Sequence, residues 1–418
     1  MNKFIDKILS RDCFFYYTLF YLTCKLLPPL QGYSIFTYIM FFYAVVVFAY
    51  NRIIKTIDLA FPCCFVSYGL LAVSIISVIV NGYDNLRNVI VDIIPIFVNM
   101  FLFFPTFKDD NKEKLKQVFD KLMICIFFIG LFTSILNIAC LVKDIISKEQ
   151  YWYIGHRMRG YLGNPNIVGW FSVVFLGSAI YVKNYNIFNK YKLHVNLPIL
   201  IAVVCIVLSQ CRSAYLALLV YILFYLFTRD RFNKLYKKHR ILINCCIALL
   251  LILFLLAISF SVERFDSGRG EILKYALFNF RNNNLILGLG FGKLRTEWVS
   301  NLSNYFSGNA FVSYDIYAGA NTHNIFLQQL CTNGFLGFGL VLIFAVVIIK
   351  KIFDYLISIN RYNSTDQNFL NSLCYFIITA LVIGQFDNDI LQSMFLFINF
   401  TFLVSAGFFL KIMECDER

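Results

Sequence analysis

Apolar residues recur along this chain in runs of about 16 to 25, the length that a helix needs to cross the hydrocarbon core of a bilayer. Segments such as 241–260 are apolar on every face, which excludes the period of two that marks a membrane β-barrel. Hydrophobic residues make up 59% of the 418 residues and charged residues only 15%. A soluble domain is about half apolar and a quarter charged. The sequence therefore predicts an all-α, polytopic membrane protein that forms one membrane domain over 1–418.

We expect about twelve membrane-spanning helices. They lie near 13–29, 33–50, 60–80, 88–106, 122–142, 166–182, 194–209, 213–228, 241–261, 324–349, 368–385 and 390–410. A single helix over 194–228 would be roughly 50 Å long at 1.5 Å per residue, which far exceeds the hydrocarbon core. We therefore expect a hairpin with its turn around Ser209–Ser213. The first apolar run has no small-residue cleavage site after it, so we interpret it as a span rather than a cleaved signal.

The charged residues predict the orientation of these spans. With the N-terminus in the cytoplasm, the inner segments hold 24 of the 37 Lys and Arg residues, although the outer segments are longer. This asymmetry places both termini of a multi-pass membrane protein in the cytoplasm. The net charge of +13 therefore reflects topology and predicts no nucleic-acid partner.

Several arginines lie on the outer side, where topology disfavours them. These are Arg157, Arg159, Arg212, Arg264, Arg269, Arg281 and Arg295. Most of them belong to the outer loops 143–165 and 262–322. In the second loop, residues 268–281 show apolar side chains on one helical face, with Glu271, Lys274 and Asn279 on the other. We expect a helix lying in the membrane interface there.

The cysteines predict neither disulfides nor a metal site. None of the thirteen lies in the long polar loop 262–322, where a disulfide framework would be expected. No Cys-x-x-Cys pair or Cys/His cluster has the spacing of metal ligands. We therefore expect no metal and no cofactor.

Four short motifs on the predicted outer face combine side chains that can bind substrate or transfer protons with turn-forming glycines. They are His156–Gly160 followed by Gly163–Asn166; Ser209–Ser213; Ser267–Arg269 followed by Gly288–Gly292; and His323-Asn324 followed by Gly334–Gly337. A histidine at a membrane boundary is most often a packing residue, and a single outer arginine often reaches lipid headgroups. Only the combination of these motifs, on one side of the membrane, favours a functional site.

These motifs resemble those of the bacterial O-antigen ligase and O-antigen polymerase superfamily. The family pattern is a His followed by Asn, Ser or Gln, then nine residues and Gly-x-x-Gly, at the end of a large periplasmic loop. It is matched without a gap by His323, Asn324, Gly334 and Gly337. An upstream Arg at an outer turn is matched by Arg212, although the family more often has Ser directly before this Arg. A Gly-Arg that opens a helix in the large loop is matched by Gly268-Arg269, with a later Gly-x-Gly at 288–290. The likeness extends over about 155–345.

The resemblance implies a C-type glycosyltransferase of the bacterial inner membrane that acts at the outer face without a metal. Its donor is a glycan linked through pyrophosphate to undecaprenol, and its acceptor is a glycan or glycolipid. Arginine binds pyrophosphate through two parallel hydrogen bonds and keeps its charge. We therefore expect Arg212 and Arg269, with Arg157 or Arg159, to bind the donor, and Asn324 to contact substrate. A neutral imidazole can accept the proton of an acceptor hydroxyl near pH 7, which makes His323 the candidate general base.

The motifs leave two acceptors open. A polysaccharide polymerase would extend a second lipid-linked repeat unit, and we place this reading first; an O-antigen ligase would use the lipid A core. Partners would include membrane lipids and, for a polymerase, a chain-length regulator. A lipid-linked oligosaccharide flippase is disfavoured because the span interiors carry almost no charge. A non-catalytic assembly protein would tolerate loss of His323.

Overall fold

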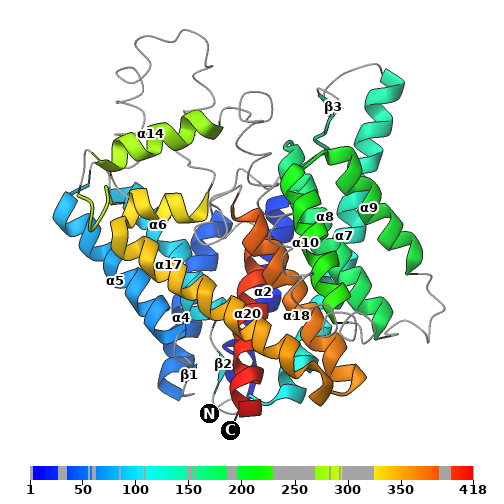
Figure 1. Cartoon of the computed structure of the whole chain (residues 1–418), viewed down its shortest axis with the longest axis horizontal. Coiled ribbons are helices and arrows are strands. Elements are labelled where there is room, and N and C mark those ends of the chain that lie inside the picture. Colours follow the sequence, from blue (N-terminus) through cyan, green and yellow to red (C-terminus); the bar gives the residue numbers. More distant parts are fainter. Residues whose placement is uncertain are drawn as a thin grey trace, which may run out of the picture.

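The computed structural model of the chain is a bundle of helices with two short strand pairs (Figure 1). The structure describes residues 3–26, 35–54, 57–58, 63–83, 86–104, 106–107, 110–147, 153–154, 157–185, 195–228, 269–281, 284–290, 293, 324–385 and 397–417. The all-α polytopic fold expected from the sequence is confirmed. Five of the described helices are individually long and apolar enough to cross a membrane, and four further apolar helices are shorter.

Every predicted span except 241–261, which lies outside the described residues, coincides with a helix. The first helices are α1 (Lys3–Ile8), α2 (Arg11–Leu26), α4 (Ile35–Ile54), α5 (Cys63–Asn81), α6 (Leu86–Val98) and the π-helical turn η1 (Asn99–Phe103). The later ones are α7 (Lys112–Ser147), α8 (Pro165–Asn184), α9 (Asn196–Ser209), α10 (Arg212–Phe227), α14 (Arg269–Arg281), α17 (Ile325–Ser358), η3 (Ile359–Arg361), α18 (Ser364–Ile383) and α20 (Phe397–Glu417). Residues 390–396 of the last predicted span lie outside the described residues.

Helices α7, α8, α9, α10 and α18 pack together on one side of the bundle, at the right of Figure 1. Small residues allow close contacts between them. A Cβ atom on Gly130 of α7 would lie 2.4 Å from the Phe175 ring of α8, and one on Gly177 of α8 would lie 2.3 Å from the Tyr375 ring of α18. Helices buried in lipid associate through such small residues because apolar burial alone does not favour protein over lipid.

Helices α4, α5, α6 and α17 form the other side, and α20 lies between the two groups (Figure 1). Helix α20 is buried on every side, and residues such as Phe402, Leu403 and Phe409 are at most 1% exposed. A helix that is apolar on every side belongs in the interior of a bundle. Here, a Cβ atom on Gly407 would lie 2.0 Å from the Phe104 carbonyl oxygen, so α20 packs directly against the backbone that follows η1.

The bundle has two distinct ends. One, which we name the inner end, carries both termini and the antiparallel pair β1 (Ile57–Asp58) and β2 (Thr106–Phe107). The opposite outer end carries α14 and the antiparallel pair β3 (Tyr153–Ile154) and β4 (Arg157–Met158).

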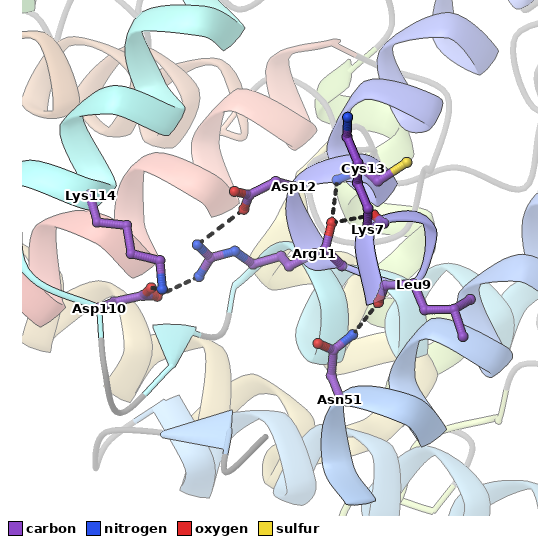
Figure 2. A network of polar contacts seen from close by, with 9 residues as sticks. Lys7, Leu9, Arg11, Asp12, Cys13, Asn51, Asp110 and Lys114 are labelled. Atoms are coloured by element: carbon purple, nitrogen blue, oxygen red, sulfur yellow. Dashed lines mark hydrogen bonds and ion pairs between the residues drawn. The ribbon is translucent and has the colours of Figure 1, made fainter. Parts of the chain in front are cut away.

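The inner end is fixed by a network of charged and polar groups (Figure 2). The buried guanidinium of Arg11 donates a 2.6 Å hydrogen bond to Asp110, whose other oxygen lies 2.9 Å from Lys114 Nζ. Asn51 Nδ2 donates to the Leu9 carbonyl at 2.9 Å. A charge buried among helices is tolerated when it is paired and hydrogen-bonded. The network therefore joins the start of α2 to α4 and to the start of α7.

Candidate functional site

The predicted turn at Ser209–Ser213 is confirmed, since α9 ends at Ser209 and α10 begins at Arg212. Gln210 adopts left-handed backbone angles, φ 49° and ψ 36°, and its N–H donates to the Val207 carbonyl at 3.1 Å. Such angles are uncommon for a residue other than glycine, so the turn needs support from its neighbours. Gly169 of α8 provides it, since a Cβ atom there would lie 2.4 Å from Cys211 Cβ. Arg212 is the first residue of α10 and is exposed.

The interior of this turn is closed by polar contacts. Trp170 Nε1 donates to Ser213 Oγ at 2.8 Å, and Cys211 Sγ lies 3.2 Å from the same oxygen. Burial raises the pKa of the Cys211 thiol. A thiol with a raised pKa stays protonated near neutral pH and is a poor nucleophile. Cys211 is therefore a packing residue of the turn.

Arg157 joins two of the motifs found in the sequence. Its Nε donates to the Ser209 carbonyl at 3.2 Å, and its Nη2 donates to Asn166 Oδ1 at 2.8 Å. The structure thus brings the 156–166 motif against the turn that presents Arg212. Both acceptors are neutral, so the positive charge of Arg157 is not neutralised by these contacts.

Arg159 lies two residues further along the same segment and differs from Arg157 in its contacts. It is half-buried, and it forms no hydrogen bond or ion pair with any residue that the structure describes. The segment turns directly after it, because Gly160 has φ +53° and a Cβ atom there would lie 1.9 Å from Asn137 Oδ1. The sequence could not rank the two arginines, whereas their contacts now distinguish them.

The start of α17 is held at the outer end by Asn324. Asn324 Oδ1 accepts hydrogen bonds from the backbone N–H groups of Phe326 and Leu327, at 2.9 and 3.0 Å, and so caps the helix. Its Nδ2 donates to the Gln385 carbonyl at 3.1 Å, and Ile325 N–H donates to the Gly384 carbonyl at 2.9 Å. His323, which immediately precedes the cap, lies outside the described residues. Substrate contact by Asn324 stays a prediction, and the cap is a role that the sequence analysis missed.

The Gly-x-x-Gly motif marks a break inside α17. Gly334 has φ 63° and ψ −159°, which interrupts the helical hydrogen bonds. Four backbone groups released by this break bind the segment 284–290 instead. Leu289 and Gly290 N–H donate to the carbonyls of Cys331 and Thr332, both at 2.9 Å. Phe335 and Leu336 N–H donate to the carbonyls of Leu285 and Ile286, at 2.9 and 3.3 Å. Non-helical backbone at membrane depth needs such partners, because lipid offers none.

Glycines make this arrangement possible. A Cβ atom on Gly334 would lie 2.3 Å from the Ile286 carbonyl, and one on Gly288 would lie 2.6 Å from Gly334 N. A Cβ atom on Gly337 would lie 2.3 Å from Asn333 Cβ, which the break brings against it. Gly334 therefore contacts the backbone of the loop rather than a neighbouring helix, because its positive φ interrupts the helix face on which a helix would pack.

Helix α14, which begins at Arg269, also packs on this break. Phe280 and Phe335 meet edge to face with ring centroids 5.3 Å apart, and Cys331 Sγ lies 3.5 Å from the Ala276 carbonyl. The helix itself confirms the prediction for 268–281, but its exposed face differs. Asn279, expected on the polar face, is 1% exposed. Its Nδ2 donates to the Tyr275 carbonyl at 3.1 Å, so the buried amide has a hydrogen-bond partner within its own helix.

The structure therefore gathers the motifs into two groups at the outer end. The first contains Arg157, Arg159 and the Arg212 turn; the second contains Asn324, the Gly334 break and α14. Helices α10 and α18 pack along each other in opposite directions, so the Arg212 end of α10 and the Gly384 end of α18 lie at the same end of the bundle. Since Gly384 binds the start of α17, α18 connects the two groups. Among the residues that the structure describes, no three His, Cys, Asp or Glu side chains gather as metal ligands.

A comparison with known proteins agrees with these motifs. The sequence model of the O-antigen ligase family matches residues 197–342. This stretch runs from α9 into α17 and includes Arg212, Arg269, His323 and Asn324, while Arg157 and Arg159 precede it. No curated protein matches the chain. The match supports a membrane glycosyltransferase-like role in O-antigen or polysaccharide assembly, and it confirms that this chain resembles the O-antigen ligase and polymerase superfamily over the part that carries the motifs.

Proposed function

We propose that this protein transfers a glycan from undecaprenyl pyrophosphate to an acceptor sugar at the outer face of a bacterial inner membrane. The observation that carries the proposal is the interlock of 284–290 with the break at Gly334. It joins the helix that begins with Arg269 to the helix that follows His323, two elements more than forty residues apart in the chain. A site for a cationic residue and a base needs such fixed placement.

In this reaction the acceptor hydroxyl oxygen forms a bond to the anomeric carbon of the donor glycan. The bond between that carbon and the phosphate oxygen breaks, and undecaprenyl pyrophosphate leaves. His323, as neutral imidazole, accepts the proton of the hydroxyl. Arg212 and Arg269 stabilise the negative charge that develops on the leaving pyrophosphate. Arginine charge substitutes for the metal ion that other glycosyl transfers use, so we expect activity to survive EDTA.

The two arginines of the 157–159 segment take different roles in this proposal. Arg157 already donates to Ser209 and Asn166, so we assign it to holding the Arg212 turn. Arg159 has no described partner for its five N–H donors, and a half-buried guanidinium without a partner favours an anionic ligand. We therefore propose Arg159 as the third arginine that contacts the donor.

Our first choice among the acceptors is a second lipid-linked repeat unit, which makes the protein a polysaccharide polymerase. The alternative is the lipid A core, which makes it a ligase. The test uses the full-length protein in proteoliposomes with one lipid-linked donor and each acceptor in turn. A polymerase makes chains longer than one repeat without lipid A core, whereas a product formed only with the core assigns the ligase. No product with either acceptor, alongside transport of the donor across the bilayer, would contradict both and favour a flippase.

A further inference from the structure

We infer that Ser77 and Asn81 of α5 are positioning residues that hold the outer-end site in its working arrangement, an inference that rests on the proposed function. Both residues lie in the first five spans, outside the stretch that matches the O-antigen ligase family. They face the interlock between the segment 284–290 and the break at Gly334. We name this pair the α5 clamp.

The clamp binds both partners of the interlock. Ser77 Oγ lies 2.5 Å from the Leu287 carbonyl and 3.3 Å from the Thr332 carbonyl, and its single hydrogen goes to the nearer acceptor. Asn81 Nδ2 donates to the Gly288 carbonyl at 2.9 Å and to the Ser77 carbonyl at 2.9 Å. Ser77 thus touches the loop and α17 at once, and Asn81 ties the turn at Gly288 to the end of α5.

The surroundings leave the clamp little freedom to move. Ser77 is fully buried, and a Cβ atom on Gly290 would lie 3.3 Å from the Ser77 carbonyl. One turn below, Asn333 Nδ2 donates to Ser74 Oγ at 3.2 Å and to Gln329 Oε1 at 2.8 Å. A row of buried polar groups therefore joins α5 to α17 along the depth of the bundle. In lipid such groups specify one helix pairing, because an unpaired polar group is costly there.

The clamp lies close to the elements that carry the proposed base and one of the proposed phosphate-binding arginines. The break at Gly334 and the cap at Asn324 belong to the same helix, and His323 is bonded to that cap. Helix α14, which begins at Arg269, contacts Phe335 directly after the break. Loosening the clamp would let α14 and the start of α17 shift relative to each other. That shift would separate the proposed base from one of the proposed phosphate-binding arginines without removing either.

The test compares Ser77→Ala, Asn81→Asp and the double variant with Ser67→Ala in the full-length protein in nanodiscs. Asn81→Asp keeps the shape of the side chain and loses its donor. Ser67 is the matched control, because it is a buried serine of the same helix whose hydroxyl donates to the Met100 carbonyl at 3.2 Å, away from the loop. Two quantities are measured: amide hydrogen exchange at Leu289, Gly290, Phe335 and Leu336, and the kinetics of glycan transfer.

We expect exchange at these four amides to accelerate by about tenfold in the double variant, with smaller changes in the single ones. We expect kcat to fall by about tenfold or more, while KM for the lipid-linked donor stays within about twofold of wild type, since the binding groups remain. Ser67→Ala should change neither quantity. Exchange that matches the control overturns the clamp, and faster exchange with unchanged kcat overturns its positioning role. If His323→Ala keeps full transfer, the proposed function fails, while the exchange measurement still decides whether the clamp exists. If the double variant fails to insert, the two single variants give the same readouts.

Discussion

The two ends of the bundle use positive charge in different ways. At the inner end, cations pair with carboxylates: Arg11 and Lys114 share Asp110, and Lys112 Nζ lies 2.5 Å from Asp366. The Arg11 guanidinium also lies 5.6 Å from the ring centroids of Phe15 and Phe408. At the outer end, the described partners of Arg157 are a carbonyl and a carboxamide, and Arg159 has none among the described residues.

This difference separates structural charge from charge that can bind a ligand. A carboxylate offsets the charge of the cation that it pairs with, so the inner network stabilises the joints between helices. An arginine held by neutral oxygens keeps its full charge, and its field is strong where water is scarce. The outer arginines are also the ones that the positive-inside rule disfavours. Their cost in topology is explained if they bind the pyrophosphate of the donor.

The difference between the two ends has the proposed meaning only if the end that carries the termini faces the cytoplasm. We expect a reporter fused after Lys237 to be active only in the cytoplasm and one fused after Asn304 to be active only in the periplasm. The contrast should be all or none, because the two positions lie on opposite sides of the predicted span 241–261. Reversed reporter activities would contradict the span count and every assignment to the outer end.

The backbone interlock gives the next largest effect. Gly334→Ala places a methyl group 2.3 Å from the Ile286 carbonyl and holds alanine at φ 63° and ψ −159°, a backbone conformation that costs about 1–3 kcal/mol for a residue other than glycine. We expect transfer to fall below detection and the melting temperature to drop. Gly339→Ala on the same helix is the matched control, because a Cβ atom there meets nothing within 4 Å. If both variants keep the same transfer activity and melting temperature, the break at Gly334 is not needed for function.

The arginines test whether charge at the outer end acts on the donor. We expect Arg212→Ala and Arg269→Ala to reduce transfer by about a hundredfold or more while the protein still inserts. Lysine at either position keeps the charge but loses the planar fork, so rescue should be partial. Lys112→Ala removes a paired cation at the inner end and should leave kcat unchanged. Wild-type activity in both outer alanine variants would identify the arginines as lipid anchors.

Arg159 and Arg157 differ in their contacts at the outer end, so replacing each should change a different property of the protein. We expect Arg159→Ala to raise KM for the lipid-linked donor by roughly tenfold, the loss of a charge-assisted contact, with little change in melting temperature. Arg157→Ala should lower the melting temperature, because Ser209 and Asn166 lose their donor. Enzyme kinetics and thermal unfolding on both variants check this. The opposite pattern, with stability lost only at Arg159, would reverse the two roles.

The sequence predicted what the bilayer dictates. Apolar runs determine which segments form helices, so the described spans and the helix at 269–281 were predictable. The length of the apolar stretch 194–228 predicted the turn at Ser209. These features depend on local composition, which is readable without knowing any contact.

The missed features depend on contacts between distant segments. The motif Gly-x-x-Gly is compatible with a smooth helix, and only the segment 284–290 shows why Gly334 turns to positive φ. Asn279 has a polar side chain and is buried because its own helix satisfies its amide. Ser77 and Asn81 look like ordinary small polar residues of a span. Polar residues within spans are a signal in themselves, and Ser74, Ser77 and Asn81, each three or four residues from the next, could have indicated a polar helix contact.

If His323 is the general base at the outer end, its loss should slow the chemical step itself, which single-turnover transfer by His323→Ala measures in proteoliposomes loaded with lipid-linked donor. We expect normal insertion, normal donor binding and a rate lower by about 10²–10⁴-fold, the usual effect of losing a general base. The wild-type rate should rise with pH as the imidazole loses its proton, and this dependence should vanish in the variant. Near-normal chain synthesis by His323→Ala would refute the catalytic role and leave His323 as a packing residue.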